Sequence, residues 1–386
     1  MSRTPYLTSK LQGFGTSIFA EMSALAVATG AINLGQGFPD TDGPAEVAEA
    51  AIAAIRAGHN QYPPGPGIPA LRQAVAEHQR RFYGIELDPD TDVLVTAGAT
   101  EALTSAVLAL CESGDEILTF EPTYDSYPAA AAMAGASLRV VTLHPPGYSI
   151  DPDELAAAVT PRTRMVLLNS PHNPTGKVFS SVELDAVARL CVEHDLIAVT
   201  DEVYEHLVFD GTHVPLSTRP GMAERTLTIS SAGKTFSFTG WKIGWAMGPA
   251  ALVAAVRTAK QFLTYVNGAP FQHAVAVGLG LGDDVYDDLR ASLLAKRDLL
   301  CAGLEKAGFE VHRPAGTYFA TVDVRSIGED DGVAFCRSLP ERCGVVAVPS
   351  AAFYADPARG KQFVRFAFCK KDEVLHEAAA RLAALS

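Results

Sequence analysis

Short apolar runs rich in β-branched residues alternate with stretches of helical periodicity between about residues 45 and 281. Such runs, bounded by turn residues, are typical of buried strands. Helical periodicity separates several of them, for example over 100–112 and 181–195. This alternation predicts an α/β fold with a mostly parallel seven-stranded sheet covered on both faces. The expected strands are 93–97, 116–120, 138–143, 164–169, 196–200, 225–230 and 242–247.

The helix expected at 181–195 has a defined start. Ser180 precedes it and Glu183 follows three residues later. This spacing is typical of a capping box, in which the two side chains satisfy backbone N–H groups that the first helical turn leaves unpaired.

The pattern changes on either side of this region. After residue 281 it predicts a long helix at 285–307 and a last helix from 372 to about 385. We expect four strands between them, at 309–312, 318–324, 345–348 and 363–368. Residues 1–44 are irregular apart from a helical stretch near 17–29. We therefore predict an N-terminal arm (1–44) that packs with the small domain and the cleft, a large domain (45–281) and a smaller α+β domain (282–386).

Composition narrows the classes of function. The chain of 386 residues is 48% hydrophobic and has a formal net charge of −13. A nucleic-acid-binding protein would instead carry a basic footprint. No apolar run is long enough for a membrane span and the N-terminus lacks a signal sequence, so we expect a cytoplasmic protein that binds neither nucleic acid nor membrane. The six cysteines show no metal-ligand spacing, so no metal is expected.

One segment combines two lysines with small and hydroxyl residues. Lys234 follows an expected strand and is preceded by Gly233, which leaves room for a ligand. A lysine that forms an imine needs a pKa lowered by burial or by nearby positive charge. Lys242 provides a second cation suited to a phosphate, and the hydroxyls of Ser231 and Thr239 flank the same loop.

This segment resembles the cofactor-attachment signature of the class I/II aminotransferases, which are pyridoxal 5'-phosphate (PLP) enzymes of fold type I. The resemblance implies that Lys234 forms a Schiff base with PLP and that Ser231 and Lys242 bind its phosphate. Most of the family has arginine at the second cation, and lysine there is typical of the kynurenine/glutamine transaminase branch. The matching residues are Ser231-x-x-Lys234-x-Phe236-x-x-Thr239-Gly240-Trp241-Lys242-x-Gly244.

The resemblance extends to two strand ends. PLP chemistry needs a carboxylate that keeps the pyridine nitrogen protonated, and Asp201 matches that residue. Tyr204 matches the donor near the phenolic oxygen of the ring. In the turn 169–176, Asn173 resembles the asparagine that contacts this oxygen and often the substrate carboxylate, with Asn169 as its support.

The phosphate and the ring face have further matches. Gly98 allows close approach at the start of an expected helix, and the amides of Ala99 and Thr100 resemble the phosphate cradle of the family. Backbone N–H groups at a helix N-terminus bind phosphate readily. Tyr124 matches the aromatic residue that stacks on the pyridine ring.

The resemblance also covers residues that bind the substrate or reach into the partner subunit. Arg365 matches the arginine that holds the substrate α-carboxylate, since a guanidinium binds carboxylate bidentately. Gly37 matches a backbone donor from the arm. Tyr62 resembles the tyrosine that reaches the phosphate of the neighbouring subunit, so the resemblance implies a homodimer with shared active sites.

The implied reaction is a ping-pong transfer of an amino group between an amino acid and a 2-oxo acid, with free Lys234 as the general base. Within the branch, residues 34–40, 61–67, 201–210 and 265–271 look most like those of actinobacterial N-succinyldiaminopimelate aminotransferases. These use glutamate to aminate N-succinyl-2-amino-6-oxopimelate in lysine biosynthesis. The loop 265–271 would then lie at the mouth of the cleft.

Other functions stay open. Kynurenine, glutamine and methionine aminotransferases share these motifs, and the same scaffold carries C–S β-lyases and decarboxylases. A PLP-sensing regulator would need an added basic DNA-binding domain, which this acidic sequence does not show. An NAD-binding enzyme is disfavoured because no G-x-G-x-x-G motif follows the first expected strand.

Overall fold

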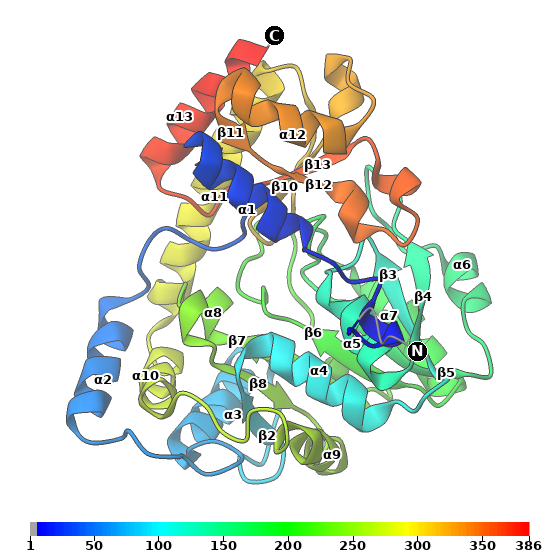
Figure 1. The fold of residues 1–386 in the computed structure, drawn as a ribbon. Coiled ribbons are helices and arrows are strands. Elements are labelled where there is room, and N and C mark those ends of the chain that lie inside the picture. Colours follow the sequence, from blue (N-terminus) through cyan, green and yellow to red (C-terminus); the bar gives the residue numbers. More distant parts are fainter. Residues whose placement is uncertain (1–5, 386) are drawn as a thin grey trace.

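A seven-stranded sheet organises the lower part of the computed structural model, which describes residues 6–385 (Figure 1). Its strand order is β2-β8-β7-β6-β5-β3-β4, and only β8 runs antiparallel to its neighbours. The mostly parallel sheet predicted from the sequence is confirmed. The strands are β2 (Val93–Thr96), β3 (Glu116–Glu121), β4 (Ser137–Thr142), β5 (Thr163–Asn169), β6 (Ile197–Asp201), β7 (Thr226–Ser231) and β8 (Gly244–Met247).

Except at the edge strand β4, where Ser137 and Arg139 are exposed, both faces of this sheet are buried, which explains why most of its strands are continuous apolar runs. Ile117 and Leu118 are neighbours in β3, yet they belong to two different cores. Ile117 packs in a core with residues of α4 (Gly98–Leu110), α5 (Ser126–Ala134) and α9 (Ala250–Lys260). Leu118 packs in another with α6 (Pro152–Ala157) and α7 (Ser181–Glu193).

The start of α7 is confirmed in atomic detail. Ser180 Oγ accepts a hydrogen bond from the Glu183 amide, and the Glu183 carboxylate accepts one from the Ser180 amide at 2.8 Å. The expected strand at 242–247 is shorter than predicted, because Lys242 has a left-handed backbone (φ 54) that excludes it from the ladder.

A third group of helices flanks the edge of the sheet at β2 and β8. α3 (Pro69–Tyr83) and α10 (Ala269–Leu279) share a core with residues of these strands, and α2 (Ala45–Arg56) packs on α10. Short 3-10 helices connect other elements: Ser9–Leu11, Leu216–Thr218, Thr239–Trp241, Val324–Ile327, Ser350–Phe353, Pro357–Gly360 and Ala383–Leu385.

The upper part of Figure 1 holds a four-stranded sheet with helices packed against it. The strand order is β12-β13-β10-β9, and its pairs are antiparallel. Its strands are β9 (Glu310–His312), β10 (Phe319–Asp323), β12 (Val348–Pro349) and β13 (Phe363–Ala367). The helices are α11 (Asp283–Lys306), α12 (Gly332–Cys343) and α13 (Asp372–Leu382).

The N-terminal arm lies on this upper part. Its helix α1 (Ile18–Thr29) buries Met22 and Ala26 in the core that surrounds the small sheet. β1 (Ile32–Asn33) then pairs in parallel with β11 (Val345–Val346). The prediction of one strand at 345–348 is therefore wrong: β11 pairs with the arm, and β12 pairs with β13 in a different sheet. Hydrophobic patterning cannot distinguish these partners.

The predicted domain boundaries stay predictions, and residues 1–5 and 386 of those ranges lie outside the described residues. All six cysteines are unpaired, and five of them are buried. Within residues 6–385, no helix has both the length and the apolar composition that crossing a bilayer requires.

Candidate active site

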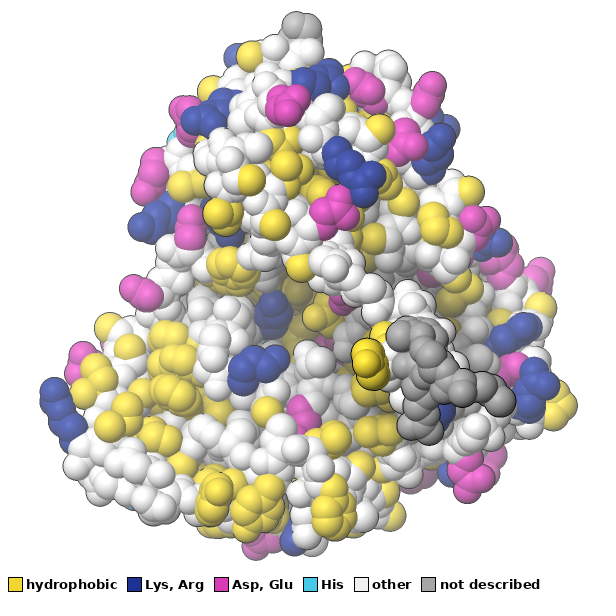
Figure 2. Space-filling model, viewed as in Figure 1, with side chains coloured by type: hydrophobic (Ala, Val, Ile, Leu, Met, Phe, Trp, Pro, Cys, Tyr) yellow, Lys and Arg dark blue, Asp and Glu magenta, His cyan; other side chains and the backbone are white. Residues whose placement is uncertain are grey.

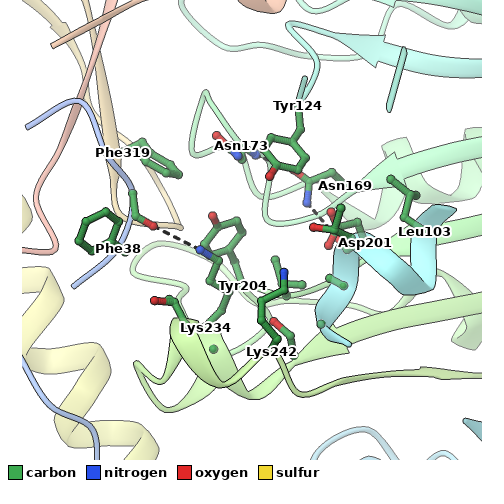
Figure 3. A pocket seen from close by; sticks show the side chains of 18 of the residues that line it. Phe38, Leu103, Tyr124, Asn169, Asn173, Asp201, Tyr204, Lys234, Lys242 and Phe319 are labelled. Atoms are coloured by element: carbon green, nitrogen blue, oxygen red, sulfur yellow. Dashed lines mark hydrogen bonds between the residues drawn. The ribbon is translucent and has the colours of Figure 1, made fainter. Parts of the chain in front are cut away.

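A cavity of about 410 Å³ opens where the arm and the small sheet face the carboxyl ends of β5, β6 and β7. In parallel sheets this edge is the usual place for ligands. Figure 2 shows the hollow between the two parts of the molecule, with basic side chains in it. Figure 3 shows residues from these distant segments pointing into the same space.

Lys234 reaches the cavity from α8 (Ala232–Thr235), the single helical turn that follows β7. Its amine donates hydrogen bonds to Tyr318 Oη (2.6 Å) and to the carbonyl oxygen of Gly37 (3.3 Å). Burial lowers the pKa of Lys234 to about 8. A substantial fraction of the amine is therefore neutral near physiological pH, as a nucleophile and base requires.

Asp201 ends β6 and has two differently placed oxygens. Oδ2 accepts a hydrogen bond from Tyr127 Oη at 2.8 Å, whereas Oδ1 is buried without a partner. Burial raises the pKa of Asp201 to about 6. A buried carboxylate oxygen with no donor is costly, so a protonated ring nitrogen in the cavity would satisfy it.

Asn169 and Asn173 fix the turn beside Asp201. Asn169 Nδ2 donates to the backbone oxygen of Asp201 at 2.8 Å, and its Oδ1 accepts from the Asn173 amide at 2.6 Å (Figure 3). These two bonds engage the Asn169 side chain, so Asn169 holds the turn in place. The Asn173 side chain instead contacts Arg365 of the small sheet.

One end of the cavity lies at the start of α4. Gly98 has φ +75, and a Cβ there would lie only 3.0 Å from Lys242 Nζ. Gly244 lets β8 approach, since its Cβ would meet the Gly98 backbone at 2.7 Å. The first-turn residues Ala99 and Thr100 also line the cavity. A helix N-terminus beside a lysine is suited to a phosphate.

Arg365 enters from β13, and its side chain is buried among aromatic rings. Nη1 donates to Asn173 Oδ1 at 2.9 Å, Nη2 donates to the Gly35 oxygen at 3.0 Å, and the buried Nε has no partner. The guanidinium lies 3.9 Å from the centre of the Phe319 ring. Burial lowers the pKa of Arg365 to about 10, so it stays charged at neutral pH and can bind an anion.

Two tyrosines complete the lining. Tyr124 precedes α5, and burial raises the pKa of its hydroxyl to about 12. Tyr204 follows β6 by three residues, and burial raises its pKa as well. Both hydroxyls therefore stay protonated at neutral pH and can donate hydrogen bonds.

Comparison with known proteins agrees with this geometry. The family described as aminotransferase class I and II matches residues 29–382. A probable N-succinyldiaminopimelate aminotransferase of Mycobacterium tuberculosis is 55% identical over 98% of both chains. The solved structure of the N-succinyldiaminopimelate aminotransferase from that organism has a TM-score of 0.97, over 98% of this chain and 100% of that chain. The methionine aminotransferase of Escherichia coli is 41% identical over 99% of both chains.

The chain belongs to the class I and II aminotransferases. It is a PLP-dependent enzyme with the fold type I architecture, as the sequence motifs predicted. The cavity of the aminotransferase fits the cofactor in three respects: the unpartnered Asp201 oxygen, the Lys234 amine, and the cradle between Gly98 and Lys242.

The aminotransferase brings nearly all of the predicted site residues into one cavity. The predicted residues among those that line it are Gly37, Gly98, Ala99, Thr100, Tyr124, Asn169, Asn173, Asp201, Tyr204, Ser231, Lys234, Lys242 and Arg365. Their individual roles stay predictions. Tyr62 lies outside the cavity of its own chain: it is 81% exposed, and its ring lies against that of Tyr265.

The loop 265–271 does not line the cavity of its own chain either. Its Asn267 instead links the end of β2 to the backbone of Lys242, because Nδ2 donates to the backbone oxygens of Lys242 (3.0 Å) and Thr96 (3.2 Å). Sequence reasoning placed this loop at the cleft mouth and missed this contact.

Sequence reasoning also missed Tyr127 and Tyr318. Tyr127 contacts Asp201, and Tyr318 contacts Lys234. Tyr127 lies three residues after Tyr124, across the turn that begins α5, so its proximity to the site could have been noticed. Tyr318 had no local signal, since it is 84 residues from Lys234.

A buried polar cluster lies outside the cavity of the aminotransferase. Ligand atoms of His78, Glu205 and His206 lie within 4.8 Å of one another. The two histidines pair through Nε2 at 2.7 Å, and Glu205 Oε1 accepts from Ser230 Oγ at 2.6 Å. These bonds satisfy the cluster within the protein, and they tie the turn after Tyr204 to the end of β7.

Proposed function

We propose that the enzyme transfers the amino group of glutamate to N-succinyl-2-amino-6-oxopimelate, a step of diaminopimelate and lysine biosynthesis. The observation that carries this proposal is the 55% identity, over 98% of both chains, with the N-succinyldiaminopimelate aminotransferase of M. tuberculosis. The identity exceeds the 41% shared with a methionine aminotransferase of nearly the same length.

Lys234 would attach the cofactor and then, once released, move a proton at the substrate Cα. Bound PLP supplies an aldehyde that condenses with amines and a ring that accepts electrons from Cα. Asp201 would hold a proton on the ring nitrogen through its unpartnered Oδ1, and Tyr204 would donate to the ring oxygen. Lys242, Ser231 and the first turn of α4 would hold the phosphate.

Arg365 would bind the α-carboxylate of each substrate. Its unpartnered Nε and the Nη2 that now faces Gly35 offer donors toward a carboxylate, and Asn173 steadies the other edge of the guanidinium. Both substrates carry an α-carboxylate, so one arginine serves both halves of the ping-pong cycle. Gly37 would add a backbone donor.

We also propose that the enzyme is cytoplasmic and consists of an arm, a large domain and a small domain. We further propose a homodimer in which Tyr62 reaches the phosphate bound by the partner subunit. The exposure of Tyr62 (81%), Phe262 (81%) and Tyr265 (49%) supports a subunit contact here. Mixed dimers of Tyr62→Ala and Lys234→Ala chains should regain activity that neither variant has alone, since one of their two sites is intact. Mixed dimers without activity would contradict shared sites.

A methionine or kynurenine aminotransferase is the second candidate, supported by relatives that are 41% and 37% identical. The two candidates differ in the tail of the substrate, which carries a succinyl carboxylate only in the first.

The test is a panel of amino donors with 2-oxoglutarate, including N-succinyldiaminopimelate, methionine and kynurenine. The proposal predicts the highest kcat/KM with N-succinyldiaminopimelate, by at least tenfold, and glutamate as a stoichiometric product. Release of pyruvate and ammonia would instead indicate elimination. Lys234→Ala should lose both turnover and the absorbance of lysine-bound cofactor, whereas Lys371→Ala, on an exposed residue, should keep both.

A further inference from the structure

The free amine of Lys234 is held by two groups that come from the N-terminal arm and from the residue before β10. Its two hydrogen-bond acceptors are Tyr318 Oη at 2.6 Å and the Gly37 oxygen at 3.3 Å. Tyr318 Oη in turn donates to the same Gly37 oxygen at 2.6 Å. The three groups form a closed triangle, of which Figure 3 shows the side between Lys234 and Gly37.

Each acceptor is held rigidly. The Tyr318 ring is 2% exposed and packs edge-to-face on Tyr204, with ring centres 5.3 Å apart. Gly37 is pressed against Phe319, since a Cβ at this position would lie 2.4 Å from the ring. Close packing therefore restricts both groups to their present positions.

Tyr318 belongs by sequence to the small sheet, yet its loop is fastened to the large part of the molecule. The Gly316 amide donates to the Gly176 oxygen and the Thr317 amide donates to the Leu207 oxygen, both at 2.8 Å. Thr317 has φ +65, and this left-handed turn points the chain into β10. The hydroxyl thus keeps its place beside Lys234.

We propose that Tyr318 is a positioning residue, which holds the free amine of Lys234 against Gly37 whenever that amine is not bonded to the cofactor. The inference rests on the proposed role of Lys234 and deepens it. After release, the long lysine side chain would otherwise sample many rotamers, and each encounter with the substrate Cα proton would be slower.

The first test measures the amine itself in the full-length, cofactor-free chain. Labelling of Lys234 by trinitrobenzenesulfonate, followed by peptide mass spectrometry, gives the pH midpoint of its reactivity. Tyr318 accepts a hydrogen bond from the charged amine, so Tyr318→Phe should shift this midpoint downward by roughly half a pH unit or more. The other groups that face the amine are Asp201, Lys242, Arg365, Cys369 and Tyr204, and all of them are unchanged in this variant.

The second test measures proton transfer. With Cα-deuterated glutamate, Tyr318→Phe should lower kcat by about tenfold with little change in KM, and it should raise the isotope effect because proton transfer becomes more rate-limiting. Tyr148→Phe is the matched control. It also removes a buried tyrosine hydroxyl, one that bonds His312 at 2.7 Å outside the cavity, and it should leave both readouts unchanged.

The outcomes distinguish a failure of the role of Tyr318 from a failure of the assignment of Lys234. An unchanged labelling midpoint and isotope effect in folded Tyr318→Phe would overturn the role of Tyr318 and leave Lys234 as the base. A wild-type protein in which Lys234 neither reacts nor binds PLP would overturn the site assignment and the inference with it. Circular dichroism and thermal unfolding of each variant show whether it is folded.

Discussion

At the scale of a single residue, the two carboxylate oxygens of Asp201 have different roles. One is held by Tyr127, which fixes the carboxylate, and the other is buried and unpartnered, which leaves it for the cofactor. Asp201 lines the cavity at the partly buried end of β6, and its Oδ1 atom is shielded from solvent. An isosteric change should therefore affect chemistry more than folding.

We expect Asp201→Asn to lower kcat by roughly 100-fold or more, because a neutral amide cannot stabilise the protonated ring nitrogen. The protein should still fold, since the amide oxygen can accept from Tyr127. Steady-state kinetics at saturating PLP measures the effect. Asp185→Asn, on α7 outside the cavity, serves as the control, and an Asp201→Asn enzyme with more than a tenth of wild-type kcat would contradict the assigned role.

At the scale of an element, the N-terminus of α4 depends on a backbone that only glycine adopts easily. Gly98→Ala should lower the free energy of unfolding by roughly 1–2 kcal/mol, because the left-handed conformation strains an alanine. It should also weaken PLP binding by about tenfold, since the new Cβ would displace Lys242 Nζ from a charge-assisted contact with the phosphate. Fluorescence titration with PLP and denaturant unfolding measure the two effects.

Gly240→Ala is the matched control for this change. Gly240 is exposed, its backbone is not left-handed, and a Cβ there meets nothing within 4 Å, although it lies in the same signature segment. PLP affinity that is equal in the two variants would show that the phosphate is held elsewhere.

The capping box of α7 contributes to stability and not to chemistry. We expect Ser180→Ala to lower the free energy of unfolding by about 1 kcal/mol, because the Glu183 amide loses its acceptor. Urea denaturation measures this loss, and kcat should stay at the wild-type value. Ser181→Ala, one residue further along and exposed, should cost far less. Equal losses at the two positions would argue against the box as the source of the stability.

At the scale of the whole molecule, one buried histidine links stability to pH. His172 lies in the turn beside Asn173 and is 2% exposed, and burial lowers its pKa to about 3. In the unfolded chain its pKa returns to about 6.5. Below that value only the unfolded state takes up the proton, so stability is full above pH 6.5 and is lost as the pH falls toward 3.

The expected loss from His172 alone is about 2 kcal/mol between pH 7 and pH 5. Denaturant unfolding at the two pH values should therefore show a steeper decline in wild type than in His172→Gln. His144→Gln provides the comparison, because the His144 side chain is 63% exposed. A His172→Gln protein that declines as steeply as wild type would assign the acid sensitivity to other groups.

The sequence by itself determined the seven strands of the large sheet and the segment that carries Lys234, Ser231 and Lys242. Burial on both faces makes those strands continuous apolar runs, and a cofactor site built on one short loop needs its residues close together in the chain. The cavity contains these residues and all but one of the other predicted site residues. Tyr62 is the exception, since it does not line the cavity of its own chain.

Only the tertiary structure decided which distant groups support that site. Tyr127 and Tyr318 look like any core tyrosines in the sequence, and Asn267 looks like any loop residue. The residues 345–348 form one apolar run that the fold divides between the arm and the small sheet. Hydrophobic periodicity indicates whether a side chain is buried, but not which residue it contacts. The reason is that apolar burial and strand pairing are compatible with many partners, and only the packing of the whole chain selects among them.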